Sequence, residues 1–168
     1  MPKVDLQRAM NVPAVPARDA AAEILHDIEA GAREWQDFAL HVNLDALGLP
    51  DVGYIAIPVR LKITGEETEP RHQIRFTVHA RRSPESFPVF DGAVGIDSSG
   101  PSGAQIWLGG SYDVPMHGLG AFFDKLVANK VAEKTLENML VDLTEAIAAR
   151  VERRELAQAR YRMFGTGD

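Results

Sequence analysis

The most constraining feature of this sequence is a long segment near its end, Ala121 to Phe164, that contains neither proline nor glycine. Within it, apolar residues recur at three- and four-residue steps, which is the period of an α-helix with one buried face. At 1.5 Å per residue, thirty residues of such a helix would span roughly 45 Å. A helix of this length needs a large partner surface to bury its apolar stripe. The stripe comprises Phe123, Leu126, Val127, Val131, Leu136, Met139, Leu140, Leu143, Ile147 and Val151.

The segments before this helix show the two-residue alternation of β-strands with one buried face. Segments 38–44, 54–63, 72–82, 89–97 and 104–112 alternate in this way, and short polar turns separate the last four. Pro58 cannot donate a ladder hydrogen bond, which favours a sheet edge or a bulge at that point. Arg60, Arg75 and His79 fall on the polar face. Turning that face inward would expose the apolar one, at roughly 1.5–3 kcal/mol for each apolar side chain, so we expect it to meet water.

The N-terminal region predicts a strand from Lys3 to Val12 and a helix after it. Pro13 and Pro16 restrict the residues that precede them, so we expect the helix to begin only after Pro16. It should extend to about residue 35, and Gly31 should either divide it or end it.

Consecutive antiparallel strands with segregated helices indicate an α+β domain. We expect a curved antiparallel sheet wrapped around the long C-terminal helix, in one domain over 1–168, with 153–168 as a helical tail that frays. Gly92, Gly110, Gly95 and Gly109 are expected on the inward face, where missing side chains permit bending. The same missing bulk fits either tight contact with the helix or an internal cavity.

Composition excludes several classes of protein. The net charge of −6 disfavours nucleic acid and anionic membranes as partners, and the absence of cysteine excludes disulfides and thiolate chemistry. No apolar run approaches the roughly 18 residues of a membrane span, so integral membrane association is not expected. The N-terminus lacks the apolar core of a signal peptide, which favours a cytoplasmic location.

The stretch from Ile106 to Leu143 resembles the end of START-like domains of the SRPBCC superfamily, especially the polyketide cyclase and dehydrase branch. In that branch a final strand ending in Gly-x-Tyr precedes a turn with proline and glycine, and then an Asp on a long helix. The residues that match are Gly110, Tyr112, Pro115, Gly118, Gly120 and Asp124, whereas Met116 replaces the usual second proline. The resemblance implies a helix-grip fold, an internal cavity for lipids, polyketides or other apolar molecules, and in some members cyclisation or dehydration.

No cofactor or metal site is predicted. Gly118-Leu119-Gly120 matches neither a dinucleotide-binding nor a P-loop motif, so a glycine-rich entry to the helix is the simpler interpretation. The histidines at 26, 41, 72, 79 and 117 lack H-E-x-x-H spacing. Two residues remain candidates for catalysis. His117 lies in the loop expected before the helix, and histidine is the usual side chain for proton transfer near neutral pH. Tyr112 lies on the inferred inner face, where its hydroxyl could orient a ligand or donate a proton.

The leading hypothesis is a module that binds a small hydrophobic molecule between the sheet and the C-terminal helix. An enzyme of the cyclase or dehydratase type, with Tyr112 or His117 as acid or base, is the alternative. A protein-interaction domain with a filled interior is a third possibility, and Tyr161, Met163 and Phe164 could dock on the domain or on a second subunit to form a homodimer. The predicted cavity lining comprises Ile57, Leu61, Phe76, Val78, Phe90, Val94, Ile106, Leu108, Tyr112, Phe123, Leu126 and Val127.

Overall fold

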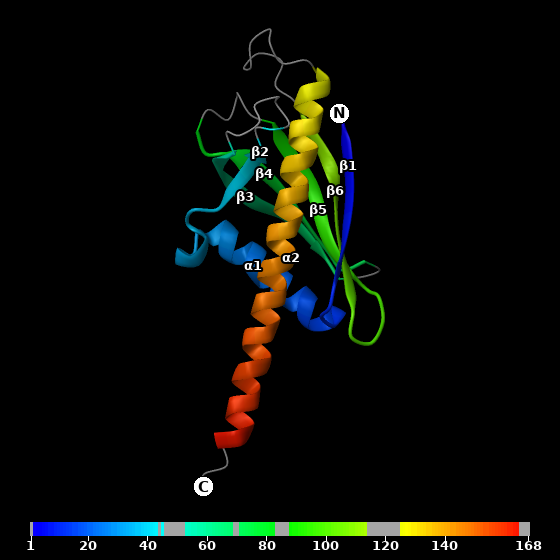
Figure 1. Cartoon of the computed structure of the whole chain (residues 1–168), viewed down its shortest axis with the longest axis vertical. Coiled ribbons are helices and arrows are strands. Elements are labelled where there is room, and N and C mark those ends of the chain that lie inside the picture. Colours follow the sequence, from blue (N-terminus) through cyan, green and yellow to red (C-terminus); the bar gives the residue numbers. More distant parts are fainter. Residues whose placement is uncertain are drawn as a thin grey trace.

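The computed structural model describes residues 2–43, 45, 53–68, 71–82, 88–113 and 125–164, without the side chains of residues 43, 125–129 and 131. Its strands form one antiparallel sheet in the order β1-β6-β5-β4-β3-β2, which curls into a half-barrel (Figure 1). The strands are β1 (Lys3–Met10), β2 (Ala39–Asn43), β3 (Tyr54–Glu67), β4 (Gln73–Ala80), β5 (Val89–Ser98) and β6 (Ala104–Asp113). The predicted curved antiparallel sheet is therefore confirmed.

Pro58 lies where β3 changes its hydrogen-bonding partner. Residues 54–58 of β3 pair with β2, whereas residues from Val59 onward pair with β4. Pro58 stands opposite Ala39 of β2, and its carbonyl accepts a hydrogen bond from the Arg81 N–H at 2.9 Å. Because the proline is outside the β3–β4 ladder, its missing N–H interrupts no pairing with β4. The expected sheet edge or bulge is therefore not what lies here: β3 is flanked by β2 and β4, and Pro58 marks the point where one pairing gives way to the other.

Helix α1 (Ala14–Ala30) begins earlier than the sequence predicts. Pro16 is the third residue of this helix, although the prediction placed the start after it. A proline is tolerated in the first turn because its missing N–H has no partner within the helix there. Gly31 ends the helix in the left-handed conformation at φ 65°, and a short 3₁₀ helix η1 (Arg33–Trp35) follows.

Helix α2 (Lys125–Phe164) has 40 residues and lies across the concave face of the sheet, with α1 packed beside it (Figure 1). The predicted apolar stripe is confirmed where side chains are described, because all six of its described members are buried. They are Leu136, Met139, Leu140, Leu143, Ile147 and Val151. These side chains join those of α1 and the inner sheet face in one hydrophobic core. No helix of the described residues is long and apolar enough to cross a membrane.

The four glycines expected on the inner face divide between the two faces of the sheet. Gly92 and Gly110 face inward, and the ring of Phe90 occupies the space where their side chains would be. Gly95 and Gly109 lie on the outer face, because each alternates with buried residues of its strand, and Gly95 is covered by the indole of Trp107. The prediction was wrong for these two. At Gly92 and Gly110 the glycines permit tight packing.

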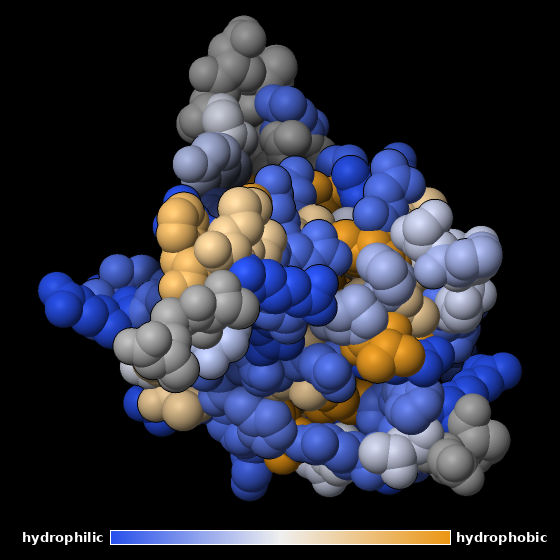
Figure 2. All heavy atoms as spheres, turned by 90° about the horizontal axis from the view of Figure 1, so that it is seen from below, coloured by the Kyte–Doolittle hydropathy of each residue, from blue (hydrophilic) through white to orange (hydrophobic). Residues whose placement is uncertain are grey.

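The last part of α2 extends beyond the sheet and α1 (Figure 1). Val151 is the last buried residue of the helix, and the aromatic side chains near its end are exposed, Tyr161 by 76% and Phe164 by 83%. Seen from this end, the molecule is largely hydrophilic with separate hydrophobic spots (Figure 2). Up to Phe164 the tail therefore continues the helix, and Tyr161 and Phe164 do not dock on their own domain; residues 165–168 lie outside the described residues, so the expected fraying stays a prediction.

Candidate ligand-binding site

Four of the predicted lining residues form a row across the inner face of the sheet. The register aligns Leu61 of β3 with Val78 of β4, Val78 with Phe90 of β5, and Phe90 with Tyr112 of β6. In antiparallel strands such cross-strand partners point to the same face, about 4.5–5.5 Å apart at Cβ. All four side chains are buried. The tertiary structure therefore brings together residues that are up to 51 positions apart in the sequence, from 61 to 112.

The remaining described members of the predicted lining follow in adjacent rows. Phe76 lies opposite Gly92 of β5, and its ring centroid is 5.9 Å from that of Phe90. Val94 pairs with Leu108 in the next row, towards α1. The buried members of the predicted lining are Leu61, Phe76, Val78, Phe90, Val94, Ile106, Leu108 and Tyr112, and Ile57 is partly buried against the same core.

Four predicted residues cannot be placed in this site. Phe123 and the catalytic candidate His117 lie outside the described residues. Leu126 and Val127 belong to the first turn of α2, but their side chains are not described. Among the predicted lining residues, those with described side chains therefore all lie on the sheet.

Tyr112 supplies the polar group of the Leu61–Val78–Phe90–Tyr112 row. Burial raises the pKa of its phenol, and the negative charge of Glu133 on α2 raises it further. Both effects disfavour the phenolate, so the hydroxyl stays protonated at neutral pH. A protonated hydroxyl on an apolar wall can donate a hydrogen bond to a carbonyl or hydroxyl of a bound molecule.

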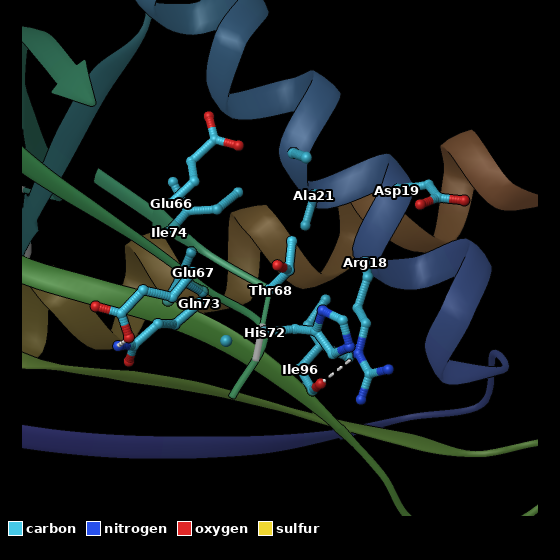
Figure 3. A pocket seen from close by; sticks show the side chains of 13 residues that line it. Arg18, Asp19, Ala21, Glu66, Glu67, Thr68, His72, Gln73, Ile74 and Ile96 are labelled. Carbon is cyan, nitrogen blue, oxygen red and sulfur yellow. Dashed lines mark hydrogen bonds between the residues drawn. The ribbon is translucent and has the colours of Figure 1, made fainter. Parts of the chain in front are cut away.

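A pocket that the sequence analysis missed reaches this inner layer from the side. It has a volume of about 150 Å³ and lies between α1 and the ends of β3, β4 and β5 (Figure 3). Its apolar wall includes Ala21 and Ala22 of α1, with Ile74, Val94 and Ile96 of the sheet. An apolar cavity of this volume is large enough for a single six-membered ring. Two adjacent alanines on the sheet-facing side of α1 were the available signal, because they leave room that larger residues would fill.

Polar residues surround the mouth of this pocket, and several of them make hydrogen bonds or ion pairs. Arg18 of α1 donates its Nε–H to the carbonyl of Ile96 at 2.8 Å, which joins the helix to β5 (Figure 3). Gln73 donates to Glu67 at 2.5 Å, and Glu66 pairs with His26 at 2.7 Å. These contacts close part of the rim over an apolar floor, an arrangement typical of sites for small organic molecules.

No metal site is found among the described residues, since no group of three or more histidine, aspartate or glutamate side chains is suitably placed. That Tyr112 or His117 acts as a general acid or base stays a prediction, because His117 lies outside the described residues and no ligand shows what Tyr112 does. The chemistry supported by the described geometry is apolar burial with one hydrogen-bonding hydroxyl.

No protein-family model matches the chain, and no curated protein matches it significantly. Solved structures do match. A conserved protein from Geobacillus kaustophilus is similar over 90% of this chain and 96% of its own, with 11% identity and a TM-score of 0.55. Ara h 8.0201 is similar over 90% and 98%, with 12% identity and a TM-score of 0.52. The ZhuI aromatase/cyclase from Streptomyces sp. R1128 is similar over 91% and 94%, with 13% identity and a TM-score of 0.47.

A START superfamily protein from Mycobacterium smegmatis also matches, over 90% of this chain and 97% of its own, with 15% identity and a TM-score of 0.42. At these identities the likeness concerns the fold and not the ligand. The predicted α+β helix-grip architecture, a curved antiparallel sheet with the long C-terminal helix across it, is therefore confirmed.

Proposed function

We propose that this protein binds a small hydrophobic molecule, such as a lipid or a polyketide, between the inner face of the sheet and α2. The observation that carries the proposal is the Leu61–Val78–Phe90–Tyr112 row, an apolar wall with one protonated hydroxyl under the long helix. Burial of a guest against it would supply affinity at roughly 25 cal/mol per Å² of apolar surface, and Tyr112 would orient the guest.

The side pocket under α1 supports the same proposal. Val94 belongs both to the predicted lining and to the wall of this pocket, so the two regions adjoin. A ring or the end of a chain could occupy the pocket while the rest of the guest lies against the sheet. The hydrogen bond from Arg18 to Ile96 would then hold α1 over the bound molecule.

Native mass spectrometry after incubation with a library of lipids and polyketides tests the proposal, with thermal unfolding as a second readout. We expect at least one guest to be retained and to raise the unfolding temperature, because a ligand that binds only the folded state stabilises it. Retention of no guest, together with no thermal shift, would count against an internal binding site.

A pair of substitutions on β4 locates the guest. Val78→Phe adds bulk on the inner face and should weaken retention of the guest, whereas His79→Phe adds a ring on the opposite face and should not. Each variant is compared only after circular dichroism shows that it is folded. Equal retention by both variants would place the guest away from the inner face of β4.

The second candidate function is a cyclase or dehydratase, in which Tyr112 acts as proton donor. The place of Tyr112 on the inner wall favours this role, and its hydroxyl carries a proton at neutral pH, although the raised pKa makes it a weaker acid than an ordinary tyrosine. With an identified substrate, Tyr112→Phe should lower turnover more than binding. If Tyr112→Phe and His117→Ala both leave turnover unchanged, neither residue is the catalytic group.

A further inference from the structure

The outer face of the sheet carries a second hollow, on the side away from both helices. It has a volume of about 680 Å³ and crosses β1, β6 and β5. We call it the outer groove, and its main residues are Asp5, Gln7, Asp91, Asp97, Trp107 and Gly109. The register places Asp5 opposite Gly109 and Gln7 opposite Trp107, so these side chains lie side by side on neighbouring strands.

Trp107 gives this polar face an aromatic surface. A Cβ built on Gly95 of β5 would collide with the six-membered ring of Trp107, so the indole lies directly against the β5 backbone. The indole therefore has one side on the sheet while it lines the outer groove. Gly95 is required here by packing, because any larger residue would displace the indole.

At position 109, by contrast, packing does not require a glycine. A Cβ built on it would meet only ordinary contacts, 3.8 Å from the Val4 carbonyl oxygen and 3.9 Å from the Trp107 ring. A glycine inside a strand weakens the strand, and often marks a place where a ligand or another chain approaches the backbone. Gly109 therefore keeps the floor of the outer groove open at a position where alanine would fit.

The polar side chains around this floor offer a mixed set of hydrogen-bonding groups. Asp5, Asp91 and Asp97 supply acceptors, and none of them makes an ion pair among the described residues. Lys3 and Arg71 supply donors. A polyanion would meet the three carboxylates, and a purely apolar guest would leave all of these groups unpaired. A ligand with many hydroxyls, each both donor and acceptor, satisfies both kinds of group.

We propose that the outer groove binds a short, uncharged saccharide. The apolar face of a sugar ring would stack on Trp107, and the hydroxyls would bond to the aspartates and to Lys3 or Arg71. Asp91 and Asp97 are six residues apart on one strand, about 20 Å, which accommodates two or three sugar units. This site is separate from the proposed internal site, since it lies on the opposite face of the sheet.

The two tryptophans of the chain allow a direct test. Trp35 is a partly buried residue whose indole N–H has no hydrogen-bond partner, so Trp35→Phe removes an unsatisfied donor and leaves Trp107 as the sole tryptophan. In this background, cellobiose and maltose are titrated while Trp107 fluorescence is recorded. We expect a saturable change with at least one disaccharide, at a dissociation constant in the range of about 1 mM.

Gly109→Ala is the decisive variant, because it fits the fold but raises the floor of the outer groove. We expect it to weaken the disaccharide by about tenfold, and we expect Lys62→Ala, on the outer face of β3, to leave binding unchanged. The proposal is overturned if neither disaccharide gives a saturable change, if Gly109→Ala binds as the parent does, or if choline chloride alone saturates the signal. The last result would identify a site for an organic cation.

Discussion

The β5 backbone and the ring of Phe90 together leave no room for a side chain at Gly110 on the inner face. A Cβ on Gly110 would lie 2.6 Å from the Cα of Gly92 and 2.9 Å from the Phe90 ring. Backbone atoms cannot move away as the end of a flexible side chain can, so this position tolerates only glycine unless the sheet shifts. The neighbouring Gly109, on the opposite face, has ordinary contacts.

Gly110→Ala should therefore lower the free energy of unfolding by about 1–3 kcal/mol, as expected for overpacking. Gly109→Ala is the matched control, one residue away on the same strand, and should change stability by less than about 0.5 kcal/mol. Urea denaturation of both variants measures the difference. Equal effects would mean that the β5 backbone and the Phe90 ring leave room for a side chain at position 110.

The buried phenol of Tyr112 makes a prediction about alkaline pH. Because burial and Glu133 raise its pKa above 10.0, the folded state holds this proton more tightly than the unfolded state. The resulting stability is present below pH 10 and is lost as the pH rises from there through the higher pKa of the folded state. Relative to Tyr112→Phe, the wild type should lose stability more steeply above about pH 10.

Ultraviolet absorbance of tyrosinate provides the direct measurement. The chain has three tyrosines, and Tyr112→Phe should remove the phase that titrates with the raised pKa. The substitution could instead lower the total change in absorbance without removing a phase at high pH. That result would mean that the fold does not shield the Tyr112 phenol.

Between the elements, one arginine connects α2 to α1 and η1. Arg150 of α2 pairs with Asp27 at 2.9 Å, with Glu23 at 3.5 Å and with Glu34 at 3.6 Å, and its side chain is only 13% exposed. Arg153 pairs with Glu34 at 3.6 Å, but its side chain is 62% exposed. Water therefore screens the Arg153–Glu34 ion pair far more than the ion pairs of Arg150.

Arg150→Met should therefore destabilise the protein by about 1–3 kcal/mol, because it leaves part of an acidic cluster without its cation. Arg153→Met, which removes a mostly exposed partner of the same Glu34, should cost less than about 0.5 kcal/mol. Thermal unfolding at low and high salt distinguishes the two. A large effect of Arg153→Met would show that the exposed pair matters more than its exposure implies.

At the scale of the whole molecule, α2 extends beyond the sheet, and this extension contributes no side chain to the hydrophobic core. Leu156, Tyr161, Met163 and Phe164 are exposed on a helical segment that follows the last buried residue, Val151. Their exposure fits the expectation that this tail contacts a second subunit. A homodimer formed in this way would leave the sheet and its two faces free.

Replacing Tyr161, Met163 and Phe164 together with serine should leave the unfolding free energy of the monomer within about 1 kcal/mol of the wild type, since these side chains are mostly exposed to solvent. Light scattering should give twice 18.4 kDa for the wild type and 18.4 kDa for the variant if the tail joins two copies. A wild-type mass of 18.4 kDa would rule out the homodimer at the concentration used.

The sequence alone determined most of the elements and the buried faces of β3 to β6 and α2. Alternation identified the inner residues of β3 to β6, and the 3.6-residue period identified the stripe of α2, because both follow from the local geometry of the chain. The same alternation contradicts the prediction that all four glycines lie on the inner face. Gly92 and Gly95 are an odd number of residues apart on one strand, so they cannot share a face.

Only the tertiary structure decided what lies beside each residue. Trp107 covers Gly95 because the β5–β6 register places them opposite each other, and no local pattern encodes that register. The pocket under α1 depends equally on where that helix crosses the sheet. A period in the sequence fixes the direction of a side chain within its element, whereas a site requires the relative positions of several elements, which packing sets.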